Sequence, residues 1–180
     1  MTKLASVEDF EHVSGQPVAS TDLVRVTRLL EMASDTVRSY TSQRLSRETS
    51  TQTLRSDGGR VWLPQRPVVE VADVQLDGQT VGFVRCGDTL HVDVDVCDVD
   101  VTYTYGYDPV PGEVVAVVAL LAARLAVNGT GVKQESVGSY SVTYASGDAG
   151  GLTRREMRTL SRYRHAAVGS VTTPSKWSSR

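Results

Sequence analysis

The spacing of apolar residues changes twice along this 180-residue chain, and the two changes limit the folds that it can adopt. Before about Thr49, apolar residues recur every three or four positions, as on one face of a helix. From there to Tyr105 they alternate with polar residues, as in strands with one buried face. The helical spacing returns after Pro111. We therefore predict an α+β fold, with a helical core of about four helices and an antiparallel β-module inserted between the second and third.

The helices are placed by apolar spacing and by end signals. Ser6 and Gly15 suit the two caps of a first helix, because a serine side chain accepts from first-turn amides and glycine adopts left-handed backbone easily. Thr153 and Glu156 form a capping box at the start of the last helix. The predicted helices cover residues 6–14, 20–44, 109–127 and 153–168. The second helix has one apolar stripe, which consists of Leu23, Val26, Leu30, Ala33, Val37 and Tyr40.

The β-module spans about residues 49–105 and contains three predicted hairpins. Asp57-Gly58 and Asp77-Gly78 are typical hairpin turns, and Cys97-Asp98 stands at the corresponding place in the third. Valines are expected to face inward and aspartates outward. The predicted pairs are residues 49–56 with 60–63, 68–76 with 79–85, and 89–96 with 99–105.

Residues 106–111 join the last strand to the third helix. Gly106 ends the strand, while Pro109 and Pro111 have no amide hydrogen to donate. A phosphate-binding P-loop needs a lysine after its last glycine, and this stretch has none. We interpret the segment as a structural corner.

The length predicts a single domain over residues 1–168, followed by an extended tail at 169–180. Residues 129–151 are rich in glycine and serine, so we expect a flexible loop with one short strand. The N-terminus lacks the apolar segment of a signal peptide, and the most apolar run is too short to span a bilayer and contains Arg124. The chain is therefore expected to be soluble, with Cys86 and Cys97 as reduced thiols.

Catalytic signatures are weak throughout the sequence. His91, Asp93 and Asp95 share one strand face and so could converge on a metal ion. The EF-hand glycine and glutamate are missing, however, and we interpret these residues as the acidic solvent face of an antiparallel sheet, which favours solubility and disfavours edge pairing. The three histidines accompany no G-x-S-x-G nucleophile motif. We expect no catalytic residues, no metal and no cofactor.

Charge is distributed unevenly, although the formal net charge is only -2. Acidic residues dominate the β-module, and arginines dominate the last helix. Four of them, Arg154, Arg155, Arg158 and Arg162, are expected on one flank of that helix. This flank is compatible with a solvated surface, with a contact to an acidic protein, or with nucleic-acid binding.

Three sequence phrases occur in a specific order: LPQRPVVEV, YTYGYDPVPGEV and ESVGSYSVTY. They lie between an N-terminal SVEDFEHVSG helix and a closing GLTRREMRTLSRYR helix. The combination resembles the head-to-tail connector, or adaptor, proteins of long-tailed double-stranded DNA bacteriophages. The resemblance extends from Leu4 to about Arg164.

The resemblance implies a structural virion protein without enzymatic activity, made in the cytoplasm of the bacterial host. Such adaptors form a ring, commonly of about twelve copies, below the portal protein. Their partners are the portal, the next neck or tail-completion protein, and themselves; genomic DNA passes through without specific binding, and no membrane is involved. The alternatives are a nucleic-acid-binding module that uses the basic helix, or a small metal-dependent enzyme. The interface candidates are Ser136, Val137, Gly138, Ser139, Tyr140, Val142, Tyr144, Arg154, Arg155, Arg158 and Arg162.

Overall fold

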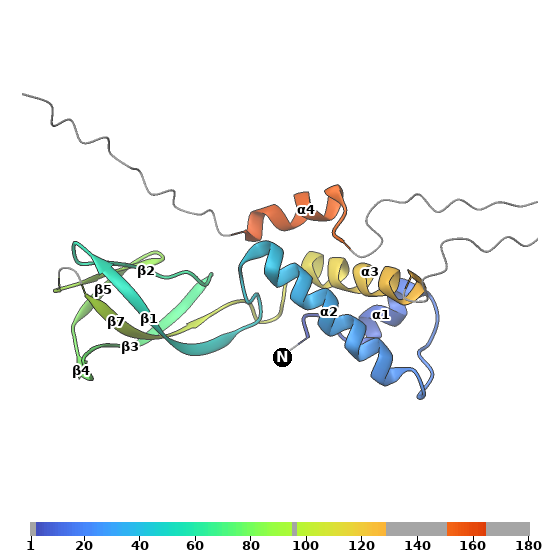
Figure 1. Cartoon of the computed structure of the whole chain (residues 1–180), viewed down its shortest axis with the longest axis horizontal. Helices are drawn as coiled ribbons and strands as arrows, with labels where there is room; N and C mark the ends of the chain where they lie inside the picture. Colours follow the sequence, from blue (N-terminus) through green and yellow to red (C-terminus); the bar gives the residue numbers. More distant parts are fainter. Residues whose placement is uncertain (1–2, 95–96, 129–150, 165–180) are drawn as a thin grey trace, which may run out of the picture.

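The computed structural model describes residues 3–94, 97–128 and 151–164. Within these ranges it has four α-helices, one 3-10 helix and a seven-stranded antiparallel sheet, so the fold class is α+β as predicted. Figure 1 shows the sheet at one end of the molecule and the helices at the other, with α4 lying over α2 and α3. The helices are α1 (Val7–Ser14), α2 (Leu23–Thr41), α3 (Gly112–Asn128), α4 (Arg154–Leu160) and η1 (Ser161–Tyr163). The strands are β1 (Glu48–Asp57), β2 (Arg60–Trp62), β3 (Val68–Leu76), β4 (Gln79–Thr80), β5 (Phe83–Cys86), β6 (Thr89–Val92) and β7 (Asp98–Tyr105).

Both ends of α1 have the caps expected from the sequence. The Ser6 hydroxyl accepts from the amide of Asp9 at 3.1 Å, and the Asp9 carboxylate accepts from the amide of Ser6 at 2.7 Å. Gly15 closes the helix with φ of 70°. These bonds satisfy amides that would otherwise lack partners in the first helical turn.

Three of the predicted helices have wrong bounds. The second helix begins at Leu23 instead of residue 20, and it ends at Thr41 because Ser42 adopts φ of 56° and leaves the helical path. The third begins at Gly112, where the Pro111 carbonyl accepts the first helical amide. The last α-helix ends at Leu160 and is followed by the short 3-10 helix η1. At Ser42 backbone geometry, rather than apolar spacing, ends the helix.

The helices enclose one of two hydrophobic cores. Its members are Leu4, Ala5, Phe10, Val26, Leu30, Ala33, Val37, Leu45, Val114, Val117, Val118, Leu121, Ala122 and Leu160. The predicted stripe of α2 supplies four of these residues, but its first member, Leu23, is 41% exposed. In the described part of the chain, no helix has the length and hydrophobicity that a membrane crossing requires.

The strand order in the sheet is β4-β3-β7-β1-β2-β6-β5. The hairpin of β1 and β2 around Asp57-Gly58 is present as predicted. The predicted third hairpin is wrong, because β6 pairs with β2 and β5, while β7 lies between β3 and β1. The predicted strand 79–85 is also wrong, since it divides at Gly82 into β4, which pairs with β3, and β5, which pairs with β6.

The sheet curls around the second core, so that strands near its two edges approach each other. Arg85 of the edge strand β5 donates to the carbonyl oxygens of Val68 and Val69 in β3, at 2.6 and 3.0 Å. It also donates to the carbonyl of Gly87 at 2.8 Å. The enclosed side chains include Val61, Leu63, Val74, Leu90, Val99, Val101 and Tyr103.

Two glutamines fix the junction between the helices and the sheet. Gln43, just beyond α2, donates to the carbonyl of Pro64 at 2.9 Å and accepts from the amide of Arg66 at 2.7 Å. Gln65 in turn accepts from the amide of Arg44 at 2.8 Å. The segment after α2 and the segment after β2 therefore exchange hydrogen bonds in both directions.

Candidate functional site

The basic helix α4 starts where the sequence predicted. The Thr153 hydroxyl accepts from the amide of Glu156 at 3.3 Å, and the Glu156 carboxylate accepts from the amide of Thr153 at 2.8 Å. This capping box fixes the first turn of a helix that has only seven residues. A helix this short needs tertiary contacts to persist.

The strongest of these contacts is an ion pair with α3. Arg124 donates to both carboxylate oxygens of Glu156, at 2.6 and 2.8 Å, and to the carbonyl of Gly151 at 3.2 Å. Burial alone would raise the pKa of Glu156, but the hydrogen bonds from Arg124 and Thr153 outweigh it, and the pKa is lowered. The carboxylate therefore stays ionised although only 7% of the residue is exposed.

A second anchor involves Glu113 in the first turn of α3. Its carboxylate accepts a short hydrogen bond from the Tyr163 hydroxyl and lies 3.2 Å from the guanidinium of Arg162. The Tyr163 ring meets the edge of Tyr107 with 5.7 Å between centroids. Burial and the Glu113 carboxylate together raise the pKa of Tyr163 to about 12, so its hydroxyl remains a donor at neutral pH.

Tyr40 of α2 supplies the third anchor. Its hydroxyl donates to the carbonyl of Met157 at 3.1 Å, and the guanidinium of Arg164 lies 5.6 Å from the centroid of its ring. Leu160, the last residue of α4, is fully buried in the helical core. Contacts with both α2 and α3 thus hold α4 in one orientation.

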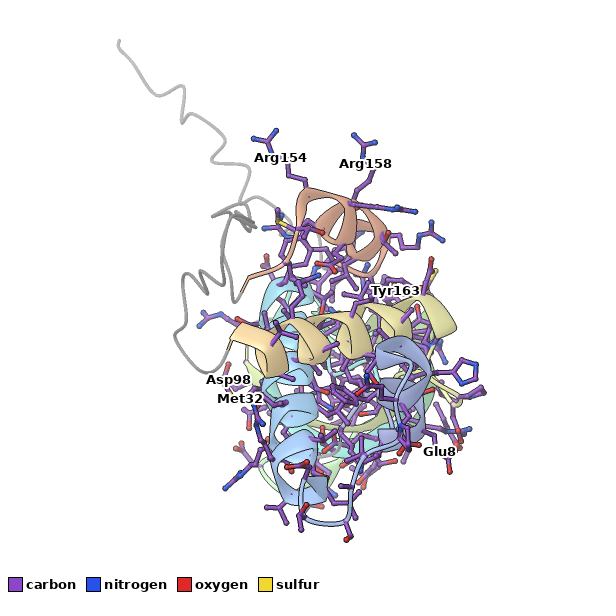
Figure 2. The ribbon with its side chains drawn as sticks, turned by 90° about the vertical axis from the view of Figure 1, so that its right-hand side faces the viewer. Glu8, Met32, Asp98, Arg154, Arg158 and Tyr163 are labelled. Atoms are coloured by element: carbon purple, nitrogen blue, oxygen red, sulfur yellow. The ribbon has the colours of Figure 1, made fainter. Side chains whose placement is uncertain are left out.

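This orientation turns three arginines toward solvent. Arg154, Arg155 and Arg158 are all exposed, and none of their guanidinium groups forms an ion pair or hydrogen bond within the described ranges. Figure 2 shows Arg154 and Arg158 pointing away from the helices below. Guanidinium groups bind carboxylates and phosphates through paired hydrogen bonds. We call these three residues the arginine face.

The predicted interface residues are only partly covered by the structure. Arg162 differs from the other three arginines because Glu113 already binds it. The loop candidates, Ser136, Val137, Gly138, Ser139, Tyr140, Val142 and Tyr144, lie outside the described residues, and so does the tail at 169–180. They stay predictions.

The residues considered for metal binding do not form a site in the described structure. His91 and Asp93 are exposed, and Asp95 lies outside the described residues. No group of three or more histidine, cysteine, aspartate or glutamate residues that could hold a metal ion occurs in the described ranges. Cys86 and Cys97 are free thiols, with Cys86 exposed.

Arg124 is the most important residue of the site that the sequence patterns did not predict. A single arginine within a strongly apolar helix signals a partly buried charge that needs a partner. The capping-box glutamate was the available partner, since Glu156 stands at the start of the next helix. The contact between Glu113 and Tyr163 had no comparable signal.

No family model matches the chain, and no curated protein matches it by sequence. Seven chains of solved structures match it by fold, among them two from the necks of particles. One is the neck of an empty GTA (gene transfer agent) particle computed with C6 symmetry, with a TM-score of 0.61, 14% identity, and coverage of 93% of this chain and 96% of the other. The other is the neck of a native GTA particle computed with C12 symmetry, with a TM-score of 0.53 and the same identity and coverage.

These matches extend over almost the whole of both chains and therefore include the helices as well as the sheet. The chain has the fold of a subunit from the neck of a phage-like particle. The resemblance to head-to-tail connectors that the sequence phrases indicate is confirmed at the level of fold.

Proposed function

We propose that the chain is a structural virion protein that forms a ring below the portal, joins the phage head to the neck and tail, and lets DNA pass. One observation carries the proposal, namely the fold match to GTA necks over 93% of this chain and 96% of theirs. A match of this extent is more informative than a shared motif, because it includes the order and arrangement of almost all the elements of both chains. The symmetry of those necks supports a ring, and twelve copies agree with the C12 structure.

The portal is the proposed partner of the arginine face. Three anchors hold α4, so its exposed guanidinium groups are positioned before binding, and less side-chain and backbone entropy is lost on docking. An acidic protein surface supplies the carboxylates that such groups bind. The loop residues 136–144 are proposed to contact neighbouring subunits or the next neck protein. The host cytoplasm is the proposed place of synthesis, and the virion neck is the final location.

DNA passage requires a surface that does not hold the phosphate backbone. Asp100 and Asp98 are exposed on β7 and pair across the strands with the exposed Thr53 and Arg55 of β1. Carboxylates repel phosphates, and this face offers few cations that could displace the counterions of DNA. These properties support transit without specific binding.

Deletion of the chain from the particles that carry it tests the proposal. We expect DNA-filled heads and separate tails that fail to join, because the surface between them is missing. Supplying the chain in trans should restore joined particles. Joined, infectious particles made without the chain would overturn the proposal.

The nucleic-acid-binding alternative is favoured by one observation, the three exposed arginines within five positions of α4. It predicts duplex binding that weakens steeply with salt and disappears in the Arg155→Glu/Arg158→Glu variant. The connector proposal predicts no duplex binding at physiological salt. A fluorescence-anisotropy titration at several salt concentrations separates the two.

A further inference from the structure

An exposed tryptophan stands on the outer face of the sheet. Trp62 of β2 is 51% exposed, and its neighbours across the strands are Thr89 of β6 and then Cys86 of β5. The next row on this face contains Arg60, His91 and Val84, of which Val84 is 69% exposed. Paired residues of adjacent strands point to the same side, so these six side chains form one surface.

The role of Trp62 is not explained by the fold of one subunit. The hydrophobic core lies on the opposite face, where Val61, Leu63 and Leu90 are fully buried. Exposed tryptophan is costly in water, and tryptophan is enriched among the residues that dominate the energy of protein interfaces. Trp62 and Val84 therefore form an exposed apolar surface that is suited to a protein contact. We call these two residues the knob.

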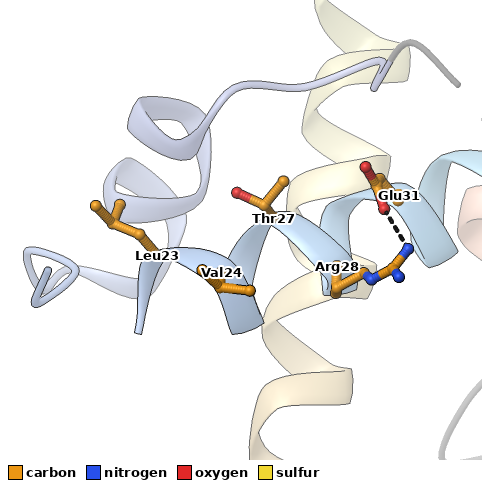
Figure 3. A pocket seen from close by; sticks show the side chains of 5 residues that line it. All are labelled: Leu23, Val24, Thr27, Arg28 and Glu31. Atoms are coloured by element: carbon orange, nitrogen blue, oxygen red, sulfur yellow. Dashed lines mark hydrogen bonds and ion pairs between the residues drawn. The ribbon is translucent and has the colours of Figure 1, made fainter. Parts of the chain in front are cut away.

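A shallow hollow lies near the start of α2, about 280 Å³ in volume. Figure 3 shows its lining side chains along the first turns of the helix, with Arg28 and Glu31 joined by an ion pair. Leu23 and Val24 form its apolar part and are 41% and 76% exposed. Thr27 completes the lining. The fold of one subunit does not explain why these apolar side chains are exposed, and the same is true of the knob.

The knob and the hollow cannot meet within one chain. The hollow lies at the N-terminal end of α2, whereas the sheet follows the C-terminal end of that helix. The 19 residues of α2 span about 28 Å along the helix axis. Two different apolar surfaces at separated places on one subunit are what a head-to-tail contact between identical copies requires.

We propose that Trp62 of one copy docks into the Leu23–Val24 hollow of the next copy, and that this contact is repeated around the ring. The inference rests on the proposed ring function and adds the pair of surfaces that forms it. Charge supports the pairing: Arg60 extends beside Trp62 with no acceptor among the described residues, and the exposed carboxylate of Asp22 immediately precedes the hollow. Opposite charges at the rim of an apolar contact favour its register.

Cross-linking in assembled particles tests the contact directly. The variant carries Thr27→Cys in the hollow and Thr89→Cys beside the knob, with Cys86→Ser and Cys97→Ser to remove the natural thiols. Trp62 is left intact. A short bismaleimide should give a ladder of multimers of this chain that extends beyond dimers. Each single-cysteine variant should give no ladder, because a head-to-tail contact joins two different sites.

A substitution pair provides a second readout. Val24→Asp places a charge in the hollow and should lower the yield of joined particles by at least about tenfold, since central apolar contacts dominate interface energy. Met32→Asp is the matched control, because Met32 is also exposed on α2 but does not line the hollow. It should leave the yield unchanged. Thermal melting of the isolated chains should show that both variants fold.

The possible failures are distinguishable. Rings of this chain seen in the neck without a cross-linked ladder would overturn the contact and leave the proposed function standing. Cross-links from the Thr27→Cys position to a different neck protein would also overturn it. Particles whose necks contain no ring of this chain would overturn both the contact and the function.

Discussion

A Cβ atom on Gly106 would lie 2.2 Å from the carbonyl oxygen of Ser46. Gly106 ends β7 with φ of 90°, and Ser46 precedes β1, so the two segments cross with no room for a side chain. The backbone cannot easily move apart, because the amide of Arg47 donates to the carbonyl of Tyr107 and the amide of Tyr107 donates to that of Leu45, both at 3.0 Å. Gly106 therefore sets the angle at which the chain leaves the sheet for α3.

Gly106→Ala should destabilise the protein by at least about 2 kcal/mol, because it combines a strained φ with a backbone clash. Urea unfolding followed by circular dichroism measures the change. Gly112→Ala is the control, since a Cβ there meets nothing within 4 Å. Its effect should stay within about 0.5 kcal/mol. Equal stability of the two variants would show that the crossing tolerates a side chain.

Arg124→Ala should release α4 from α3. The substitution leaves the Glu156 carboxylate buried without its main donor, which should cost about 1–3 kcal/mol. Hydrogen exchange should become faster in α4 and η1 and stay unchanged in the sheet. The comparison is Arg28→Ala, which breaks only the exposed Arg28–Glu31 pair and should have almost no effect. Unchanged exchange in α4 after Arg124→Ala would refute the anchoring role.

The same ion pair predicts a dependence of stability on acid. The pKa of Glu156 is lowered from its ordinary value of 4.5, so its ionised form stabilises the folded state above that pH. This contribution should be lost as the pH falls through the folded-state pKa. The difference in melting temperature between the natural chain and Glu156→Gln should therefore shrink below pH 4.5. A difference that stays constant from neutral to acid pH would contradict the assignment.

Reversal of charge on the arginine face tests its proposed role in docking. Arg155→Glu/Arg158→Glu should prevent the joining of heads and tails, while the melting temperature changes little, because exposed substitutions shift stability by no more than about 0.5 kcal/mol. Lys3→Glu/Arg47→Glu makes the same change of charge at exposed positions elsewhere. This control should assemble normally. Normal joining by the Arg155/Arg158 variant would count against the arginine face as a docking surface.

Local signals in the sequence were sufficient for the starts of the first and last helices. Ser6 and Thr153 cap their helices through contacts three residues away, and such short-range contacts are encoded in neighbouring residues. The helix ends were less predictable. Ser42 stops α2 by adopting positive φ, and no residue type at this position announced it.

Strand pairing required information that alternation does not contain. The alternating valines of β7 show that one face is buried, but they fit any neighbouring strand equally well. Cys97-Asp98 was interpreted as a hairpin turn because it separates two alternating segments. In the structure β7 instead lies between β1 and β3, so its partners are set by packing across the whole sheet.

The candidate site also has one part that the sequence predicts and one part that it does not. Arg154, Arg155 and Arg158 could be predicted as one exposed surface from helical spacing. The anchors that orient this surface join residues far apart in sequence, such as Tyr163 and Glu113, which are 50 positions apart. Side-chain hydrogen bonds over that distance follow from the tertiary fold and cannot be inferred from a local pattern.

The central claim is that this chain forms a ring in the neck, and cryo-electron microscopy of assembled particles measures it most directly. Without imposed symmetry, the neck density below the portal should contain a closed ring into which the described helices and curled sheet fit at every repeat. About twelve copies are expected, as in a closed cyclic assembly. A neck with only one or two copies, or with none, would contradict it.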